Sequence, residues 1–480
     1  MKEENLPKKR CIKEFLHKCL NLPRKLFCRY TDKTLPASNS FGILTDYAVF
    51  GMGKFFFMFI VFFKEKSYIC EAVKKESEHQ TKNEYLITPM NQKAIGRIKV
   101  VDALRGIALF AIVVLHCFEH YNLYCIPQDS PQWLTALDRG VWDTTWFLMA
   151  GKAFSTFSLL FGLSFFIQCT NTERRGVAFR GRFVWRMFLL FLFSQLHALF
   201  YNGDILLLYA VMGLFLVSVS RLSTRTLLII ATVMILQPME WIRWICALCD
   251  ASFIEYGDHW RTYAALAKPV MRDGSFIEVL KSNIIDGQLY GNLWQIEHGR
   301  ICQIGGLFLF GTIAGRLSLF RHTAESMAWW KKITLWSALL FIPMNVLCMA
   351  YPAMAEGNKA LLAPLDIAIP SICNFLFMSF LVGCFVLLWY DKGHGYRLQR
   401  LFIPFGKMSL TNYLAQSVIG VTLFYGFGFN LYGSTGATVC LLIAICIFSV
   451  LLLFSRLWLK THEQGPLEWL WKKGTWMRWR

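Results

Sequence analysis

Ten long apolar segments, separated by short polar loops, occupy most of this chain. Each segment is about 17 to 25 residues long, the length that an α-helix needs to cross the ~30 Å hydrocarbon core of a bilayer. The composition agrees, since 55% of the 480 residues are hydrophobic, more than in an average soluble domain. The segments span residues 99–118, 144–169, 183–200, 204–220, 224–246, 301–320, 330–351, 368–390, 409–430 and 434–459. The sequence therefore predicts an all-α polytopic membrane protein with about ten transmembrane helices.

The loops alternate in charge from one side of the predicted membrane to the other. The loop 119–143 holds Glu119, Asp129, Asp138 and Asp143 against Arg139 alone. The loops on the other side are basic and contain Lys93, Arg97, Lys99, Arg174, Arg175, Arg180, Arg182, Arg186, Arg221, Arg225, Arg321, Lys331, Lys332, Lys392, Arg397, Arg400 and Lys407. Because Lys and Arg accumulate on the cytoplasmic face, we expect both termini to be cytoplasmic.

The formal net charge of +19 follows from this one-sided distribution. Nucleic-acid binding would need basic residues gathered on one solvated face together with aromatic platforms. We therefore expect the lipid bilayer as a partner and no nucleic acid.

Residues 1–89 do not share the pattern of the rest. They lack helical or strand periodicity, and their one apolar run, Phe55–Phe63, is too short to span a bilayer. The features of a signal peptide are missing as well. Met90 opens an ordinary cytoplasmic approach to the first apolar segment. We expect 1–89 to be a non-native or disordered extension, and 90–480 to form a single transmembrane helical domain.

Two stretches outside the apolar segments are predicted to lie at the membrane surface. In the outer loop 247–300, Ser275 and Glu278 have the spacing of a capping box, and Gly287 is placed to end the helix. The tail 465–480 combines tryptophans with basic residues in a pattern typical of an interfacial amphipathic helix.

Polar groups inside apolar segments are costly and usually serve a site. The first segment carries Asp102, Arg105, His116, Glu119 and His120. Arg105 and His116 are eleven residues apart, so they share a helix face and lie about 16 Å apart along the axis. We take Asp102, Arg105 and His116 as catalytic candidates, and Glu119 and His120 as substrate-binding candidates. Alternatively, Arg105 only extends to the inner interface, and Glu119 and His120 only contact outer water.

His116 to His120 also reads H-x-x-E-H, a zinc-binding signature in which the glutamate acts as base. A third ligand would have to come from elsewhere, with Glu297 or Asp143 as nominees. Such a short match arises easily by chance, and we predict no metal.

Two further groups are candidates for substrate binding. His197 is followed by Asp204, which stands at the start of a helix, where a carboxylate also serves simply as a cap. Glu297 and Arg300 enter the sixth segment from outside. A cavity that brought these residues together with Arg105 and His116 would favour a common site.

Several motifs resemble those of the YeiB-type family of bacterial inner-membrane proteins, a domain of unknown function. They are R-I-K-V-V-D-A-L-R-G-I-A-L (97–109), L-H-C-F-E-H-Y-N (115–122), G-D-I-L-L-L-Y-A (203–210), F-G-K-M-S-L-T-N-Y-L-A-Q-S (405–417) and G-P-L-E-W-L-W (465–471). The resemblance covers about residues 92–477 and implies a location in the cell inner membrane. The first segment is also similar to that of membrane acyltransferases of the heparan-glucosaminide acetyltransferase and acyltransferase-3 kinds, in which an arginine and a histidine with this separation serve the transfer.

That second similarity implies acyl transfer. Acyl-CoA, as a donor substrate and not a bound cofactor, would meet Arg105 from the cytoplasm. His116 would act as general base on a small-molecule or glycan acceptor, or transiently accept the acyl group. The competing interpretation is a transporter or channel for a small polar solute, with the same residues lining its pathway.

Overall fold

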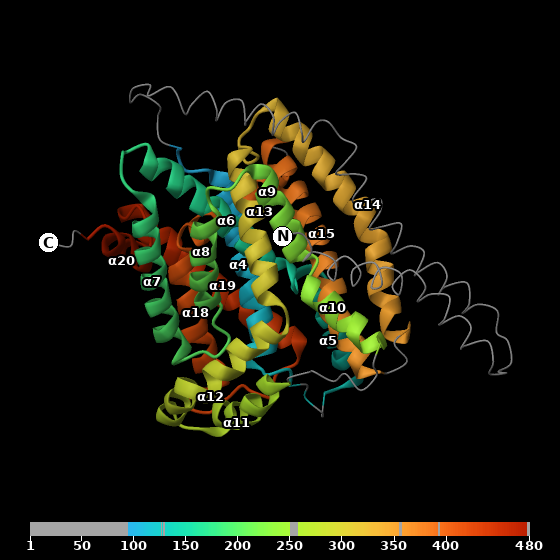
Figure 1. Cartoon of the computed structure of the whole chain (residues 1–480). Coiled ribbons are helices and arrows are strands. Elements are labelled where there is room, and N and C mark those ends of the chain that lie inside the picture. The colour runs from blue at the N-terminus through green and yellow to red at the C-terminus, as the bar shows by residue number, and fades with distance from the viewer. Residues whose placement is uncertain are drawn as a thin grey trace, which may run out of the picture. The chain divides into compact units, whose positions relative to one another are not determined.

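The computed structural model describes residues 95–125, 127, 130–249, 258–354, 358–391 and 394–477. These residues belong to one compact unit, Cys70–Arg480. Across these ranges the regular structure is helical, without a strand (Figure 1), which confirms the all-α prediction. The predicted extension 1–89 lies outside the described residues.

The first half of the described chain runs from α4 to α12. Its helices are α4 (Lys99–His116), the π-helical turn η1 (Cys117–Tyr121), α5 (Gln132–Met149), α6 (Lys152–Glu173), α7 (Phe179–Ala198), α8 (Leu206–Val219), α9 (Thr224–Ile235), α10 (Pro238–Cys249), α11 (His259–Asp273) and α12 (Phe276–Glu297). The second half comprises α13 (Arg300–Arg316), α14 (Ala324–Met354), α15 (Lys359–Asp391), α16 (His394–Leu401), α17 (Ile403–Lys407), α18 (Ser409–Phe424), α19 (Ala437–Thr461) and α20 (Pro466–Thr475).

Five helical stretches of the described chain are long and apolar enough to cross a membrane, and the bent pair α9 and α10 would make a sixth. The five are Lys99–Tyr121, Gln132–Glu173, Ala324–Ala353, Lys359–Asp391 and Ala437–Thr461. The other predicted segments also form helices, α7, α8, α13 and α18. They are shorter or carry more charge, so length and composition alone support a membrane protein of five to six apolar spans.

The predicted outer loop 119–143 is largely helical, which corrects the sequence interpretation. Its second half belongs to α5, which continues almost directly into α6. The break lies at Gly151, whose backbone has φ +77°. A Cβ at Gly151 would also collide with the Asn374 amide, so glycine permits both the turn and the close packing.

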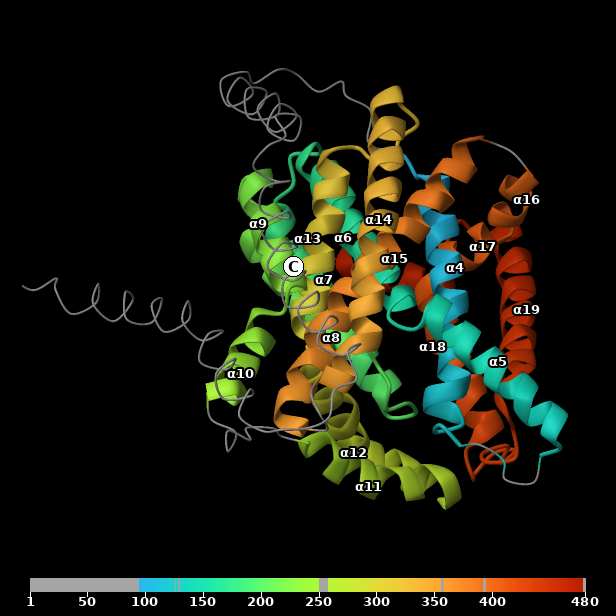
Figure 2. The ribbon, with the colours of Figure 1, turned by 90° about the vertical axis from the view of Figure 1, so that its right-hand side faces the viewer.

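Helix α4 lies at the centre of the described helices and packs against α6, α17 and α19 (Figures 1 and 2). The contact with α17 is unusually close. A Cβ on Gly406 would lie 1.9 Å from the Asp102 carbonyl oxygen, and one on Gly106 would lie 2.2 Å from the Phe402 carbonyl oxygen. The two glycines therefore let the backbones touch, which holds α4 in a fixed position.

The segment predicted as the outer loop 247–300 contains two helices, α11 and α12, that pack on each other (Figure 2). The capping box predicted at Ser275 and Glu278 is confirmed, since each side chain bonds the other's backbone N–H. The predicted end at Gly287 is wrong, because α12 continues to Glu297. Gly287 instead makes room for the side chain of Asn283.

The C-terminal helix α20 is docked on other helices. The Trp185 indole donates to the Gly474 carbonyl oxygen at 3.0 Å, and the Trp471 indole to the Arg186 carbonyl oxygen at 3.0 Å. Trp469 and Leu470 remain about half exposed. Contact of this exposed side with a membrane surface stays a prediction.

Candidate functional site

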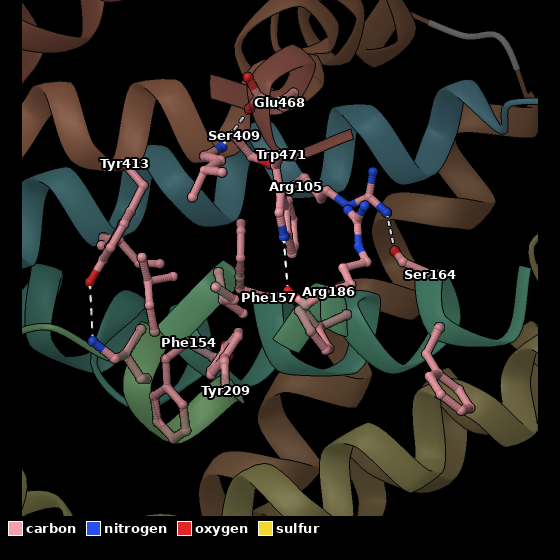
Figure 3. Close-up of a pocket in the computed structure, with 18 of the residues that line it drawn as sticks. Arg105, Phe154, Phe157, Ser164, Arg186, Tyr209, Ser409, Tyr413, Glu468 and Trp471 are labelled. Atoms are coloured by element: carbon pink, nitrogen blue, oxygen red, sulfur yellow. Dashed lines mark hydrogen bonds between the residues drawn. The ribbon is translucent and has the colours of Figure 1, made fainter. Parts of the chain in front are cut away.

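A cavity of about 810 Å³ runs beside α4 between the loop before this helix and the turn after it. Its walls come from α4, α6, α7, α8, α11, α12, α13, α17, α18 and α20, and Figure 3 shows part of the lining. The lining changes in character along its length: basic residues lie at one end, aromatic rings in the middle, and histidines with a glutamate at the other end.

Arg105 points into the cationic end of the cavity (Figure 3). Its guanidinium contacts the Asp102 carboxylate at 3.2 Å and the Ser164 hydroxyl on α6. Asp102 also accepts from Arg97 at 2.5 and 3.1 Å. The buried carboxylate therefore fixes the direction of Arg105 but does not itself line the cavity.

A second arginine, Arg186 on α7, shares this end. Its guanidinium lies 3.5 Å from the centroid of the Trp471 ring, a close cation–π contact. Arg182 lies 4.3 Å from the centroid of Trp476 in the same way. Both pairs join α7 to α20, so the C-terminal helix forms part of the cationic wall. Arg97, Arg175, Lys407 and Lys472 also line this region.

Glu468 connects α20 to the N-terminus of α18. Its carboxylate accepts from the backbone N–H of Leu410 at 2.7 Å and of Thr411 at 3.1 Å, and from the Thr411 hydroxyl at 2.6 Å. A carboxylate at a helix N-terminus satisfies otherwise unpaired donors and interacts well with the helix dipole. This bond holds α20 over the cationic end.

The middle of the cavity is aromatic. Phe154 and Phe157 of α6 lie beside Tyr209 of α8 (Figure 3). Phe161, one turn further along α6, also lines the cavity, with 5.3 Å between its ring centroid and that of Tyr209. The Tyr209 hydroxyl lies 2.7 Å from the Ser158 hydroxyl, so its polar atom is satisfied inside the wall. This section suits an apolar or flexible chain that offers few hydrogen bonds.

His116 lies at the far end, nearly buried, with its Nδ1 3.0 Å from the side-chain amide nitrogen of Gln416 on α18. The side-chain oxygen Oε1 of Gln416 in turn accepts from the Tyr121 hydroxyl at 2.7 Å. Tyr201 packs against the imidazole with 5.1 Å between ring centroids. The His116 ring is therefore held in place by Gln416 and by Tyr201.

Three other predicted residues line the cavity: Glu119, His120 and Arg300. The His120 ring lies edge-on to His116, with 5.3 Å between the centroids. Arg300 is stacked over Phe154 at 3.9 Å and donates to the Gln303 side chain at 2.8 Å. With Arg105 and His116, five of the predicted residues share one cavity.

Helices α11 and α12 add Lys268, Tyr290 and Trp294 to the far end of the cavity. Burial lowers the pKa of Lys268 and raises that of Tyr290 to about 12, because both charged forms lose water. Tyr290 therefore stays neutral at physiological pH.

The other predicted residues lie outside the cavity wall. His197 and Asp204 form a buried pair with 2.7 Å between Nδ1 and Oδ1. Asp204 also accepts from the Ser194 hydroxyl at 2.5 Å and from the Leu207 N–H at 3.2 Å, so it caps α8 as well. Asp204 thus both pairs with His197 and accepts from a backbone N–H in the first turn of α8.

Glu297 lies apart from the cavity and is 3.3 Å from His259. Neither it nor Asp143 completes a metal site with His116 and His120, since in the described ranges no three His, Cys, Asp or Glu side chains gather as ligands.

The site also contains residues that sequence reasoning did not select. Gln416 stands inside the 405–417 motif and Trp471 inside the 465–471 motif, so both could have been found there as polar or amphipathic groups in otherwise apolar stretches. Arg186 was assigned only to the basic side of the membrane. Its distance from α20 in sequence hides the contact with Trp471.

Comparison with known proteins finds relatives over most of the chain. Residues 314–478 match a family described as protein of unknown function, DUF418. The uncharacterised protein YxaH of Bacillus subtilis is 29% identical over 404 residues, which cover 80% of this chain and 95% of the relative. The uncharacterised protein YeiB of Escherichia coli is 25% identical over 395 residues, which cover 78% and 95%. These descriptions assign no reaction.

Proposed function

The chain is similar to the uncharacterised proteins YxaH and YeiB, whose descriptions assign no reaction, so we propose its function from the cavity: transfer of an acyl group from cytoplasmic acyl-CoA to a polar acceptor of the cell envelope. The observation that carries the proposal is that Arg105 and His116 line the same cavity. They lie about 16 Å apart along α4. An elongated thioester can therefore contact both residues at once.

The cationic end is the binding site for the phosphates of the donor. Arg105 offers a planar fork that suits phosphate oxygens, and Asp102 and Ser164 hold it in place. Arg186, Lys407 and Lys472 add positive charge on the same wall. The aromatic middle then holds the uncharged arm of the donor, so that its thioester reaches the histidine end.

The acceptor enters from the opposite side, where Glu119, His120 and Lys268 meet His116. Its hydroxyl or amine attacks the thioester carbonyl there. Since the outer helices α11 and α12 contribute to this wall, an envelope molecule reaches the site without crossing the bilayer.

The proposal requires the cationic end to face the cytoplasm. What supports this orientation is that Arg97, Arg175 and Lys407, from three separate segments of the chain, line the same end of the cavity, and basic residues between spans accumulate on the cytoplasmic side. In this arrangement α7, α8, α13 and α18 cross the membrane as shorter helices, which gives ten crossings, cytoplasmic termini and a location in the inner membrane.

The test is release of free CoA thiol from acetyl-CoA and palmitoyl-CoA by protein in liposomes, with and without an envelope glycan fraction. His116→Ala should lower release at least about 100-fold, the range expected for loss of one group that contacts the reacting atoms. Arg105→Lys should raise the KM for donor, because the ammonium loses the fork. His322→Ala and Arg221→Lys, which lie outside the cavity lining, serve as matched controls.

Other outcomes would overturn the proposal. Flux of a small polar solute without thioester cleavage would support the transporter or channel. Wild-type release from both His116→Ala and Arg105→Lys would remove acyl transfer at this cavity. Equal loss from His116→Ala and His120→Ala, reproduced by a chelator, would indicate a metal site.

A further inference from the structure

The hydrogen bonds around His116 determine which ring nitrogen carries its proton. A neutral imidazole has one N–H and one acceptor nitrogen, and the partner of each nitrogen decides which is which. The partner of Nδ1 is the side-chain amide of Gln416. The orientation of that amide is therefore the decisive feature.

Three neighbours fix the Gln416 amide. Its nitrogen lies 3.1 Å from the Tyr413 carbonyl oxygen, which only accepts, and 2.8 Å from the Ser417 hydroxyl. Its oxygen lies 2.7 Å from the Tyr121 hydroxyl. Turning the amide over would set two carbonyl oxygens against each other in a fully buried place, which costs free energy. The nitrogen therefore faces His116, and Nδ1 accepts.

Consequently the proton of neutral His116 is on Nε2. Within the described ranges the only hydrogen bond of the His116 ring is the one at Nδ1, and Nε2 has no protein partner. His116 itself lines the cavity. An N–H group that is free and borders the cavity can bind a carbonyl oxygen, but it cannot take up a proton.

The neighbouring His197 has the opposite arrangement. Its Nδ1 lies 2.7 Å from the Asp204 carboxylate, which only accepts, so Nδ1 carries the proton. Its Nε2 is buried without a partner. Two histidines packed against the same ring, Tyr201, thus hold their protons on different nitrogens.

We infer that His116 is a hydrogen-bond donor to the acyl carbonyl oxygen, not a base, and that Gln416 is the positioning residue that keeps the proton on Nε2. This inference rests on the proposed acyl transfer. As the acceptor oxygen bonds to the acyl carbon, the Nε2–H stabilises the negative charge on the carbonyl oxygen. The C–S bond then breaks. The acceptor proton passes to His120, which lines the same end, and from there to the thiolate sulfur.

The first test reads the proton position without any substrate. Nitrogen chemical shifts of ¹⁵N-histidine-labelled protein in lipid nanodiscs distinguish the two neutral tautomers, and loss of a signal in His116→Gln and His197→Gln assigns the residues. We expect Nε2–H at His116 and Nδ1–H at His197, which serves as an internal reference. Gln416→Glu should reverse His116 to Nδ1–H, because a carboxylate only accepts. Nδ1–H at His116 in the wild type would overturn the inference.

The second test compares two substitutions of one residue by CoA release. His116→Gln keeps an N–H donor near the place of Nε2 but cannot act as a base, so it should retain about 10-fold more activity than His116→Ala, or more. Gln416→Leu should lower kcat with little change in the KM for donor, whereas Gln399→Leu, a buried glutamine outside the cavity lining, should leave both unchanged. Equal loss in His116→Gln and His116→Ala would overturn the donor role.

The two tests also separate this inference from the proposed function. If the wild type transfers no acyl group from any donor tested, the proposed function fails, and the donor role fails with it even where the spectrum shows Nε2–H. If transfer occurs and His116 carries its proton on Nδ1, only the inference fails.

Discussion

Helices α4 and α14 are almost equally apolar, yet they occupy opposite environments. Of the most apolar stretch of α4, 78% is buried inside the protein, against 11% of that of α14. In Figure 1, α14 runs along the outer edge of the helices while α4 lies among them. A membrane makes this difference possible, because lipid solvates apolar side chains as well as a protein interior does.

The comparison shows what hydropathy does and does not reveal. It identifies helices that suit a bilayer, but it cannot distinguish a helix that faces lipid from one that holds a site. The charged groups make that distinction here: α4 holds Asp102, Arg105 and His116 within its span, whereas in α14 the charges Glu325, Lys331 and Lys332 lie in the first turns.

The largest expected effect is that of Asp102→Ala in α4. The substitution leaves Arg105 without its carboxylate partner, and removing one member of a buried ion pair costs about 3 to 5 kcal/mol. The melting temperature in detergent should fall sharply, while Asp391→Ala, at the exposed end of α15, should leave it unchanged. An unaltered melting temperature for Asp102→Ala would contradict the central role assigned to α4.

A matched pair of leucines tests the comparison directly. Leu109 in α4 is fully buried and Leu339 in α14 is 49% exposed. Leu109→Ala should leave a cavity and cost about 2 kcal/mol or more, whereas Leu339→Ala should change stability by no more than about 0.5 kcal/mol. Thermal unfolding of both variants in one detergent gives the answer. Equal losses would mean that α14 is covered by protein, for example by a second copy.

Glu468→Gln should have a smaller effect, confined to α20. The amide keeps the shape but weakens the charge-assisted cap on α18, which is worth about 1 kcal/mol. Loosening of α20 should raise trypsin cleavage at Lys472 and Lys473 and acrylamide quenching of tryptophan fluorescence. Glu463→Gln, an exposed neighbour, is the control. Strong quenching already in the wild type would instead contradict the predicted membrane contact of the tail.

The smallest effect is expected from Tyr351→Phe in α14. The Tyr351 hydroxyl donates to the Asp366 carboxylate on α15 at 2.6 Å. Asp366 is exposed. Loss of this hydrogen bond should cost less than about 1 kcal/mol, since water can replace it. A fall in melting temperature as large as that of Asp102→Ala would show that α14 is as tightly held as α4.

Local patterns in the sequence predicted much of the fold. The apolar segments all became helices, and the capping box at Ser275 formed because it needs only residues three apart. The predicted helix end at Gly287 was wrong, because a glycine ends a helix only where packing does not favour continuation of the helix. Here the Asn283 side chain occupies the space beside Gly287.

The candidate site was predicted as far as it lies on one helix. Arg105 and His116 follow from the periodicity of α4 alone. The contact of His116 with Gln416 joins residues 300 positions apart, and no local pattern specifies such a pair. The partners of Asp102, in contrast, are local: Arg105 is three residues away and Arg97 is five, so a pair with Arg105 on one helix face could be predicted from spacing alone. The catalytic role of Asp102 stays a prediction.

The docking of α20 affects the order in which the protein can mature during synthesis. This helix is translated after all the other described walls of the cavity, and it supplies both the Glu468 bond to α18 and the Trp471 face beneath Arg186. Until it emerges, Arg186 lacks its contact with Trp471, and the N-terminus of α18 lacks its contact with Glu468. A chain that lacks α20 would keep its apolar helices but lose this wall of the cavity, so the docking of α20 is the last step by which the described residues assemble the cavity.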